Sequence, residues 1–588
     1  MSASNSTTPI TRSSGRQRTK TWKIREQNEF IPIVVHPLPK IAKPILDHPI
    51  PHFEPESRIL FDSMRPTTPC TDPISVFLHL LGEQTLAALV ESTNEYANYY
   101  TQKPTLPRSR PWYNLTRNEL IVFIGTLFYM GRHPEHNIEY YWRPEMHHLG
   151  QYMLKNRWEQ IHRFLTMNTQ ERQPDQPWFY KLEPAVTTIR SNIASAVSPA
   201  SWLAVDEMMV AFRGRSKHTV KVKNKPIDQG FKIWALGFNG YIYTFRFHSG
   251  CEGSEGMNKP RQFEQHELPP IQLAPQFQVP IVLCQQVRTL HPEQQYLVFL
   301  DNLFLNIHIA HCLLAIGFAV MGTTRKNAAG IPDALLEVKN TEKKSRKQLV
   351  WNSVMAVIVS FCLCFLWQDN NAVIAITTAH SLHRQEDQVE VLRRRPKATS
   401  SNAAITWPVF EGQSTKWLRI PSAINDYNHG MNGVDTASQL RTGFSCHKPH
   451  EVKWWRPLFY WLLDICANNS YLLWRTTQPI THKLHQQFID TLIHSLLHYD
   501  KWTPNPANIH QVIRLEGRRR CAYGIKRPGA CLQGDSKRDT NRRFGTEISG
   551  NARPDRRPRQ IRTACKQCQI PLCTDRICWQ AFHAIATS

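Results

Sequence analysis

The sequence predicts a mixed α/β protein, and three observations carry this prediction. Short β-like runs separated by turns rich in Gly, Pro and Lys begin near residue 202. A buried strand pattern, Tyr296-Leu-Val-Phe-Leu, is followed by a helical stretch and then by another strand. Helical apolar spacing dominates before residue 200 and after residue 435. Strands first, followed by alternating strand and helix, are typical of a mixed sheet covered by helices.

The N-terminal third is predicted to be an arm followed by helices. Residues 1–70 are rich in Ser, Thr and Pro without a sustained apolar period, which indicates a mostly disordered basic arm. From Asp72 onward, apolar residues recur at helical spacing in several stretches, the last of them Trp158-Glu-Gln-Ile-His-Arg-Phe-Leu. This spacing predicts a helical domain over residues 71–200.

The middle of the chain carries the strands. The runs 202–212, 230–236 and 240–247 are most simply three antiparallel strands, and the strand at Tyr296 ends at Asp301. A helix through 310–315 and a strand from Gly317 follow, so residues 201–334 are predicted to form the first part of an α/β core. Residues 335–420, with the basic segment Lys343-Lys-Ser-Arg-Lys and an apolar run from Val354 to Trp367, are interpreted as an insertion.

Charge and length restrict the class of protein. The 588 residues contain 71 Lys+Arg against 47 Asp+Glu, a formal net charge of +24, and both ends are cationic. A polyanion is the natural partner of such a chain, because neutralised phosphates release counterions. The longest apolar run is shorter than the ~20 residues that cross a bilayer, and the N-terminus has no signal-peptide pattern. A soluble, unsecreted protein without membrane contact is therefore expected.

Two acids interrupt or follow buried strands. Asp206 lies within Ala204-Val-Asp-Glu-Met, and Asp301 ends Leu297-Val-Phe-Leu-Asp. A carboxylate at such a place is costly unless a cation meets it. Taken alone, each acid is better explained as a strand-end acid that caps a turn or pairs with a lysine, and a catalytic role for the two needs further support.

Several ordered segments resemble the piggyBac transposase family. They are Val205-Asp-Glu-Met-Met-Val-Ala-Phe-Arg-Gly-Arg, Lys225-Pro-Ile-Asp-Gln-Gly-Phe-Lys-Ile-Trp, Leu300-Asp-Asn-Leu-Phe, Gly322-Thr-Thr-Arg-Lys-Asn and Tyr427-Asn-His-Gly-Met-Asn-Gly-Val-Asp. The resemblance runs from about Pro73 to the C-terminus. It implies a ribonuclease-H-like catalytic core completed by residues 421–442, and a split, mainly helical DNA-binding and dimerisation domain completed by residues 443–510.

The resemblance also implies a reaction. Asp206, Asp301 and Asp435 match the family's three catalytic acids, which hold Mg²⁺ or Mn²⁺ for a two-metal phosphoryl transfer. Cut-and-paste transposition would proceed through 3′-end nicking, a DNA hairpin and joining to a TTAA target. The implied partners are double-stranded DNA at the transposon ends and the target, and a second copy of the chain in a homodimer. Arg325 and Lys326 are candidates for gripping DNA phosphate; a solvated face is the alternative.

One position departs from the family pattern. The family commonly has a further Asp three residues after the third acid, and Ser438 stands there. A hydroxyl supplies no negative charge to a metal. A domesticated or degenerate relative that binds DNA without full catalysis therefore remains an alternative. Asp369, in the insertion, is interpreted as a turn or polar cap and not as a member of the site.

The C-terminus has the spacing of a zinc site, so residues 511–588 are predicted to form a cysteine-rich zinc finger with a basic flank. The family domain implied here holds two zincs, but Gly524 occupies the place of one expected cysteine. Either Cys531 or His510 replaces it, or the domain holds one ion firmly and the other poorly. A third hypothesis, a chromatin factor that reads proteins through this module, is disfavoured by 17 Lys+Arg against 6 Asp+Glu in the tail. The DNA substrate and basic clusters predict nuclear localisation. The predicted zinc ligands are Cys521, Cys565, Cys568, Cys573, Cys578 and His583.

Overall fold

The protein divides into two units, Met1–Asp500 and Lys501–Ser588, which are described separately. In the second unit, β18 (Val512–Arg520), β19 (Gln560–Cys565) and β20 (Ile570–Pro571) form an antiparallel sheet in that order. The computed structural model describes residues 34–35, 65–67, 70, 72–101, 112–223, 225–333, 335–336, 339, 354–369, 371–382, 387–400, 403–446, 451–477, 485–499, 512–520, 560–565 and 570–571.

A large mixed sheet organises the first unit, which confirms the mixed α/β prediction. Its strand order is β1-β13-β14-β15-β12-β11-β4-β6-β7-β8, with the short β5 paired to β6. The strands are β1 (Val34–Val35), β4 (Trp202–Ala211), β5 (Val220–Lys221), β6 (Gln229–Phe238), β7 (Tyr241–Ser249), β8 (Gly253–Ser254), β11 (Tyr296–Leu300), β12 (Phe318–Thr324), β13 (Val354–Val359), β14 (Cys362–Gln368) and β15 (Ala372–Thr377).

The three strands expected after residue 201 are antiparallel, as predicted. β6 and β7 are joined by Asn239-Gly240, whose φ angles of 51° and 88° are both positive. Asn-Gly is the pair that two-residue hairpin turns of this twist favour. The next strands, β11 and β12, run parallel to each other, and β11 is also parallel to β4. Antiparallel and parallel pairing therefore meet at β4, and they meet again at β12, which is antiparallel to β15.

Two helices cover one face of this sheet. They are α6 (Pro275–Leu290) and α7 (Ile307–Ala315), which pack on β6, β7 and β12 and on each other. No helix was expected between residue 247 and Tyr296, so α6 was not predicted. Pro275 occupies its first turn, where the missing N–H costs nothing. Pro280 lies within the helix, whose buried residues include Val279, Leu283 and Val287.

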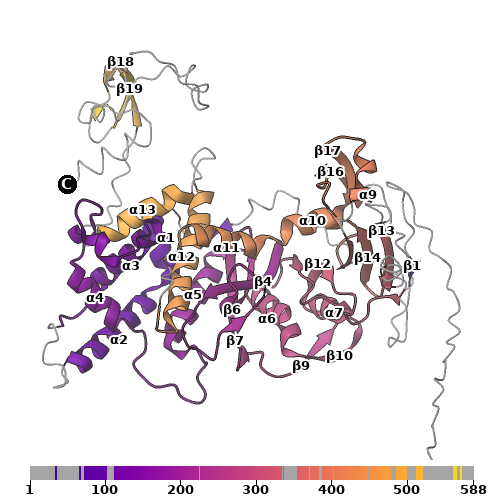
Figure 1. The fold of residues 1–588 in the computed structure, drawn as a ribbon, viewed down its shortest axis with the longest axis horizontal. Coiled ribbons are helices and arrows are strands. Elements are labelled where there is room, and N and C mark those ends of the chain that lie inside the picture. Colours follow the sequence, from indigo (N-terminus) through magenta and orange to yellow (C-terminus); the bar gives the residue numbers. More distant parts are fainter. Residues whose placement is uncertain are drawn as a thin grey trace, which may run out of the picture. The chain divides into compact units, whose positions relative to one another are not determined.

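The opposite face is covered by helices from distant parts of the chain (Figure 1). Side-chain alternation along β7 shows the two faces: Thr244 donates a hydrogen bond to Gln286 of α6, whereas the ring of Phe245 lies 4.9 Å from that of Trp461. Trp461 belongs to a helix that is buried at every residue from Arg456 to Trp474. The covering helices are α5 (Glu183–Ser195), α10 (Ser422–Gly430), α11 (Gly433–Gly443) and α12 (Arg456–Thr476).

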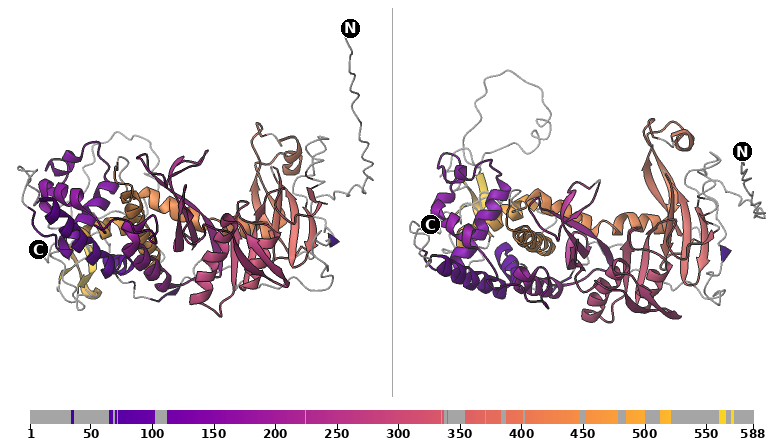
Figure 2. Two further views of the ribbon diagram at one scale, coloured as in Figure 1. Left: turned by 90° about the horizontal axis from the view of Figure 1, so that it is seen from below. Right: turned by 60° about the horizontal axis from the view of Figure 1, so that its bottom comes forward.

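The N-terminal helices contact the last helices of this unit. α12 lies between α1 and β7, as its contacts show and Figure 2 illustrates, and Arg132 pairs with Asp490 at 3.0 Å. No single helix of the described ranges is long and apolar enough to cross a membrane, although α1 and α2 pass by length and composition as a pair bent by 68°. These helices are α1 (Pro73–Leu81), α2 (Glu83–Thr101), α3 (Arg117–Arg132), α4 (Lys155–Phe164) and α13 (His485–Leu497).

Part of the region interpreted as an insertion belongs to the main sheet, and part of it forms a separate hairpin. β15 pairs antiparallel with β12, and β14 and β13 follow, so the apolar run Val354–Trp367 continues the main sheet. In the predicted N-terminal arm, Val34 and Val35 pair with β13. Smaller elements are the hairpin β16 (Gln388–Arg394) and β17 (Thr415–Pro421), the pair β9 (Arg261–Gln265) and β10 (Leu268–Leu273), the pair β2 (Arg65–Pro66) and β3 (Val197–Ser198), α9 (Ala403–Thr406) and the 3-10 turns Ile138–Trp142, Leu149–Gln151, Tyr180–Leu182 and Pro408–Phe410.

A close backbone approach positions the start of α11 against the β6–β7 turn. The N–H of Gly240 donates to the carbonyl oxygen of Gly433 at 2.9 Å. A Cβ added at Gly433 would lie 2.9 Å from the carbonyl oxygen of Gly237 and 3.0 Å from the Cα of Phe238. These are backbone atoms of a buried strand, so they cannot move aside cheaply.

We expect Gly433→Ala to destabilise the protein by about 1–3 kcal/mol through overpacking. Gly443→Ala, at the other end of the same helix, is the matched control, because a Cβ there meets no atom within 4 Å. The control should be neutral or stabilising by up to ~1 kcal/mol. Urea-unfolding midpoints of the two variants and the wild type measure this difference. Equal midpoints for both variants would contradict the packing described for Gly433.

Candidate active site

Strand register makes Asp206 and Asp301 neighbours. In the parallel pair of β4 and β11, Leu300 lies opposite Val205. Asp301 follows Leu300, and Asp206 follows Val205, so the next position of the ladder holds the two acids. Both side chains are partly exposed to solvent. Asp206, in the middle of β4, and Asp301, directly after β11, therefore lie where water and a ligand can reach them.

Asp435 joins the two acids from the helical layer. It lies in the first turn of α11 and is exposed, and α11 packs on β4 and β6. The charges of Asp435 and Asp301 both act on the carboxyl group of Asp206. The structure thus brings together the three acids that the sequence singled out, although they lie 95 and 134 residues apart along the chain.

Burial and neighbouring carboxylates make Asp206 a weaker acid than an exposed aspartate. Burial raises the pKa of Asp206 to about 7, the N–H of Glu207 opposes the rise through a hydrogen bond, and the charges of Asp435, Asp301 and Glu207 add to it. Burial also raises the pKa of Asp301. The N–H of Leu303, at 2.8 Å, and the charge of Arg325 act in the opposite direction.

Glu207, next to Asp206, points to the other face of β4 and is neutralised there. Its carboxylate pairs with Lys232 at 2.5 Å and with Lys225 at 3.0 Å. Burial works against the charge of Lys225, but the carboxylates of Glu207, Asp206 and Asp435 together raise its pKa. Lys225 therefore remains protonated close to the three acids. The sequence contained Lys225 in a recognisable segment but offered no signal for this pairing.

The acids fit the donor set of a hard divalent cation. No Lys or Arg in the described part of the chain forms an ion pair with Asp206, Asp301 or Asp435. Carboxylate oxygens are ligands that Mg²⁺ and Mn²⁺ prefer, and a cation would offset both the burial and the repulsion that raise the pKa of Asp206. Their oxygens do not all lie within 4.8 Å of one another, so a single ion would not bridge all three in this arrangement.

Three other residues flank the acids. Arg325 and Lys326 follow β12 and are exposed, and the Arg325 Nε donates to the side-chain oxygen of Asn302 at 3.1 Å. Burial, together with the charges of Asp301 and Asp206, raises the pKa of Tyr427 on α10. Tyr427 was not singled out by its residue type, because nothing in the sequence shows that α10 lies beside β4.

Asp369 and two tryptophans have structural partners. Asp369, interpreted as a turn or polar cap, pairs with Arg393 at 2.7 Å. Trp455 is buried at 4% exposure, and Trp454 is partly buried beside Trp178, at 5.8 Å between ring centroids.

The predicted zinc ligands fall almost entirely outside the described residues. Only Cys565 lies within them, at the end of β19, where it pairs with Val512 and Ile570. Cys521, Cys568, Cys573, Cys578 and His583, together with the substitutes Cys531 and His510, lie outside. The zinc prediction therefore stays a prediction.

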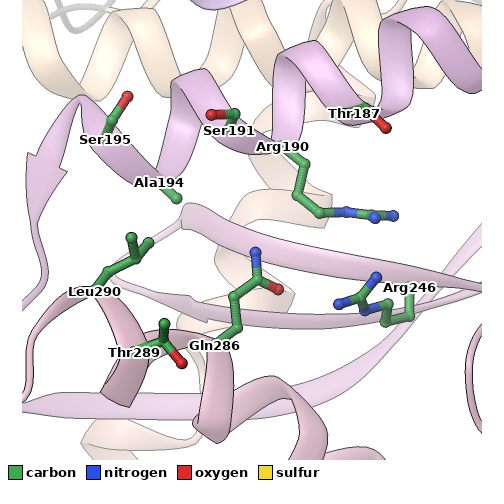
Figure 3. Close-up of a pocket in the computed structure, with 9 residues that line it drawn as sticks. All are labelled: Thr187, Arg190, Ser191, Ala194, Ser195, Arg246, Gln286, Thr289 and Leu290. Atoms are coloured by element: carbon green, nitrogen blue, oxygen red, sulfur yellow. The ribbon is translucent and has the colours of Figure 1, made fainter.

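A cavity of about 440 Å³ lies apart from the three acids, which do not line it. Helices α5 and α6 and strand β7 form its walls, and Arg190 and Arg246 line the same side of it (Figure 3). Both guanidinium groups bind the carboxylate of Glu255 at 2.9 Å. This ion pair already offsets part of their charge, so the cavity is not the candidate active site.

Comparison with known proteins defines the class. The sequence model of a family described as "Transposase IS4" matches residues 72–471, which is more than half of the chain. The chain belongs to this transposase family. Within it, the chain is a member of the piggyBac group, as its relatives and its fold agree.

Two human relatives and one solved structure illustrate the likeness. PiggyBac transposable element-derived protein 3 is 23% identical over 369 residues, 62% of this chain and 56% of the relative. PiggyBac transposable element-derived protein 2 is 21% identical over 411 residues, 68% of this chain and 61% of the relative. The chain thus spans less than two thirds of their length. The cryo-EM structure of a piggyBac transposase synaptic complex with hairpin DNA has a TM-score of 0.56 at 16% identity, covering 87% of this chain and 99% of that one. This likeness shows the fold.

The pKa of Asp206 predicts a pH dependence of stability in the metal-free protein. Its folded pKa of about 7 lies above the unfolded value near 3.9, so the folded state binds the proton more tightly. This contribution to stability is complete below pH ~4 and is lost as the pH rises through ~7. Between pH 4 and pH 8, the free energy of unfolding of the wild type should fall relative to that of Asp206→Asn by on the order of 3 kcal/mol.

Chemical unfolding of both proteins in chelator-containing buffer at several pH values measures this difference. Asp175→Asn serves as the control, since Asp175 is an exposed acid of the same type. If the difference in unfolding free energy between the wild type and Asp206→Asn stays constant across this range, the folded protein does not raise the pKa of Asp206.

Proposed function

We propose that this chain is a metal-dependent DNA transposase whose phosphoryl-transfer site is formed by Asp206, Asp301 and Asp435. The observation that carries the proposal is the convergence of three acids from separate segments. Asp206 and Asp301 directly follow Val205 and Leu300, which are partners in the parallel ladder. The charges of Asp301 and Asp435 act on the carboxyl group of Asp206. A protein core rarely assembles carboxylates without cations unless a ligand supplies the positive charge.

We further assign a ribonuclease-H-like core to strands β4, β6, β7, β11 and β12. Three antiparallel strands are followed by two strands parallel to the first, in the order β7-β6-β4-β11-β12. Asp206 lies on the first of these strands, Asp301 just after the fourth, and Asp435 at a helix start. The family resemblance puts its catalytic acids at the same three places.

The acids are proposed to hold Mg²⁺ or Mn²⁺, which would activate the attacking oxygen and stabilise the leaving oxygen of an in-line displacement. The protein's own part is to hold the carboxylates on β4, directly after β11 and in the first turn of α11 before any ligand arrives. Lys225, kept protonated by Glu207, places a cation beside them for a DNA phosphate. Arg325 and Lys326, exposed after β12, are proposed to contact the DNA backbone.

On this basis the proposed reaction is cut-and-paste transposition with 3′-end nicking, hairpin formation and joining to TTAA. It needs two transposon ends at once, so a homodimer of the chain is part of the proposal. The split helical domain is supported by contacts between residues 71–200 and the helices after residue 450. For residues 511–588 we propose zinc binding and DNA contact, supported by the cysteine spacing and by three consecutive arginines, Arg518 to Arg520. A nuclear location follows from this substrate.

The second candidate function is that of a DNA-binding relative with reduced catalysis. It is favoured by Ser438, which lies on α11 three residues after Asp435, where the family commonly has an acid. It is also favoured by two human relatives, which are named as transposable element-derived proteins. Cleavage and DNA binding must therefore be measured separately.

We expect Asp301→Asn to remove DNA cleavage while leaving DNA binding intact. Loss of one metal ligand should slow cleavage more than about 100-fold, because several kcal/mol of charge stabilisation in the transition state disappear. The assay uses duplex DNA that ends in the element's own terminal sequence, with Mg²⁺ or Mn²⁺. A gel-shift assay on the same duplex measures binding.

Asp369→Asn is the matched control, since Asp369 pairs with Arg393 and not with the acids. It should cleave at the wild-type rate. If the wild type binds the duplex and protects it without cleaving it, the second candidate function is correct. If Asp301→Asn cleaves normally, the proposed site is wrong.

Zinc removal should affect residues 511–588 and leave the larger unit folded, because ligand binding and folding are coupled in small zinc modules. Limited proteolysis with and without a strong chelator tests this expectation: cleavage within 511–588 should become faster. Unchanged digestion of this segment would contradict zinc binding there.

A further inference from the structure

A second group of ligand-type side chains lies outside the acidic site. His218 precedes β5, while Cys251 and Glu252 occupy the turn between β7 and β8. Within the described residues, this is the only trio of His, Cys, Asp or Glu side chains that presents one ligand atom each within 4.8 Å of the others. Its imidazole, thiol and carboxylate differ in kind from the all-oxygen set of the three acids.

We propose that His218, Cys251 and Glu252 bind one zinc ion that joins the loop after β4 to the β7–β8 turn. Imidazole nitrogen and thiolate sulfur favour borderline-soft cations and disfavour Mg²⁺ and Ca²⁺. The site goes beyond the proposed transposition chemistry and does not depend on it.

The distances suit a tetrahedral ion. Zinc–ligand bonds of about 2.0–2.3 Å place neighbouring ligand atoms roughly 3.3–3.8 Å apart. The Sγ of Cys251 already lies 3.6 Å from the Nδ1 of His218. The Glu252 carboxylate, within 4.8 Å of both, therefore needs to move by no more than roughly 1.5 Å to complete a three-ligand site. Cys251 is exposed, which leaves a fourth position for water.

The backbone and neighbouring side chains hold this arrangement in place. The N–H of Gly250 donates to the carbonyl oxygen of His218 at 3.2 Å. A Cβ at Gly250 would lie only 2.7 Å from the carbonyl oxygen of Thr219, so glycine permits the two segments to approach. The His218 ring is buried at 9% exposure and stacks on Trp178, at 4.6 Å and 18°.

Ser249 organises the turn that carries two of the ligands. Its hydroxyl oxygen accepts from the N–H groups of Cys251 and Glu252, at 3.2 and 3.0 Å, and lies 2.9 Å from the Nδ1 of His218. The hydroxyl also lies 3.4 Å from the Sγ of Cys251, so it stands beside two of the three ligand atoms. A zinc ion would take over the Nδ1 of His218 and leave the backbone hydrogen bonds of Ser249 in place.

Arg172 is the main competitor for Glu252. Its guanidinium donates to both carboxylate oxygens at 2.8 Å. An ionised carboxylate has about four lone-pair positions, so one oxygen can bind the ion while a hydrogen bond to arginine remains. Such an outer partner orients the ligand, as carboxylate and carbonyl partners do for metal-bound histidine. Lys217, at 3.8 Å from Glu252, adds a second cation that weakens but does not block binding.

The test is the zinc content of the full-length chain after chelation, reloading and desalting. Cys251→Ser should lower the content by about one zinc per chain, and Cys568→Ser keeps this site while disrupting the proposed C-terminal one. Lys217→Ala is the matched control at a neighbour that is not a ligand, and it should keep the wild-type content. Circular dichroism verifies that the exposed Cys251→Ser variant remains folded.

Cobalt(II) provides an independent readout. The cobalt–thiolate absorption of Cys568→Ser should disappear when Cys251→Ser is added, and it should weaken strongly with Glu252→Gln. Equal zinc content in the wild type and Cys251→Ser, or a cobalt–thiolate signal unchanged by Cys251→Ser in the Cys568→Ser background, would overturn the proposal.

Discussion

Burial of one carboxyl group beside two others is the constraint on which the site depends. Asp206 and Asp301 each follow a residue of the last pair of the parallel ladder, Val205 and Leu300, and Asp435 approaches from α11. Burial, with a further contribution from the neighbouring carboxylates, raises the pKa of Asp206, so ionising all three acids costs free energy. The buried strands offset that cost, because every residue of β11 and most of β4 are removed from water. A rigid sheet thus keeps charges together that would separate in a flexible segment.

The alternation of side chains along β4 gives two consecutive acids opposite environments. Asp206 faces the layer of α11, where the described residues provide no ion-pair partner, whereas Glu207 faces the other side and binds Lys225 and Lys232. One acid stays available to a cation, and the next fixes a lysine nearby. A shift of one residue in register would exchange these environments, so the pairing of β4 with β6 and β11 is as important to the site as the acids themselves.

Helices distant in sequence support this sheet. α12 is buried along almost its whole length, and its Asp464 accepts hydrogen bonds from Ser445 at 2.6 Å and from the N–H of Cys446 at 2.9 Å. Arg441 of α11 lies 3.5 Å from the same carboxylate. The helix that carries Asp435 is therefore linked to the buried layer at its C-terminal end and to the β6–β7 turn at its N-terminal end.

Local patterns in the sequence determined the mixed α/β class, the three antiparallel strands, a buried strand from Tyr296 and helices after residue 435, since alternation and apolar spacing report burial directly. They also singled out Asp206 and Asp301, and the resemblance supplied Asp435. They missed α6 and the continuation of the sheet through β13 to β15. Only the tertiary structure decided the register that joins Asp206 to Asp301, the ion pairs of Glu207, and the meeting of His218 with Cys251. Those contacts link residues far apart in the chain, and periodicity within a segment carries no information about its partner.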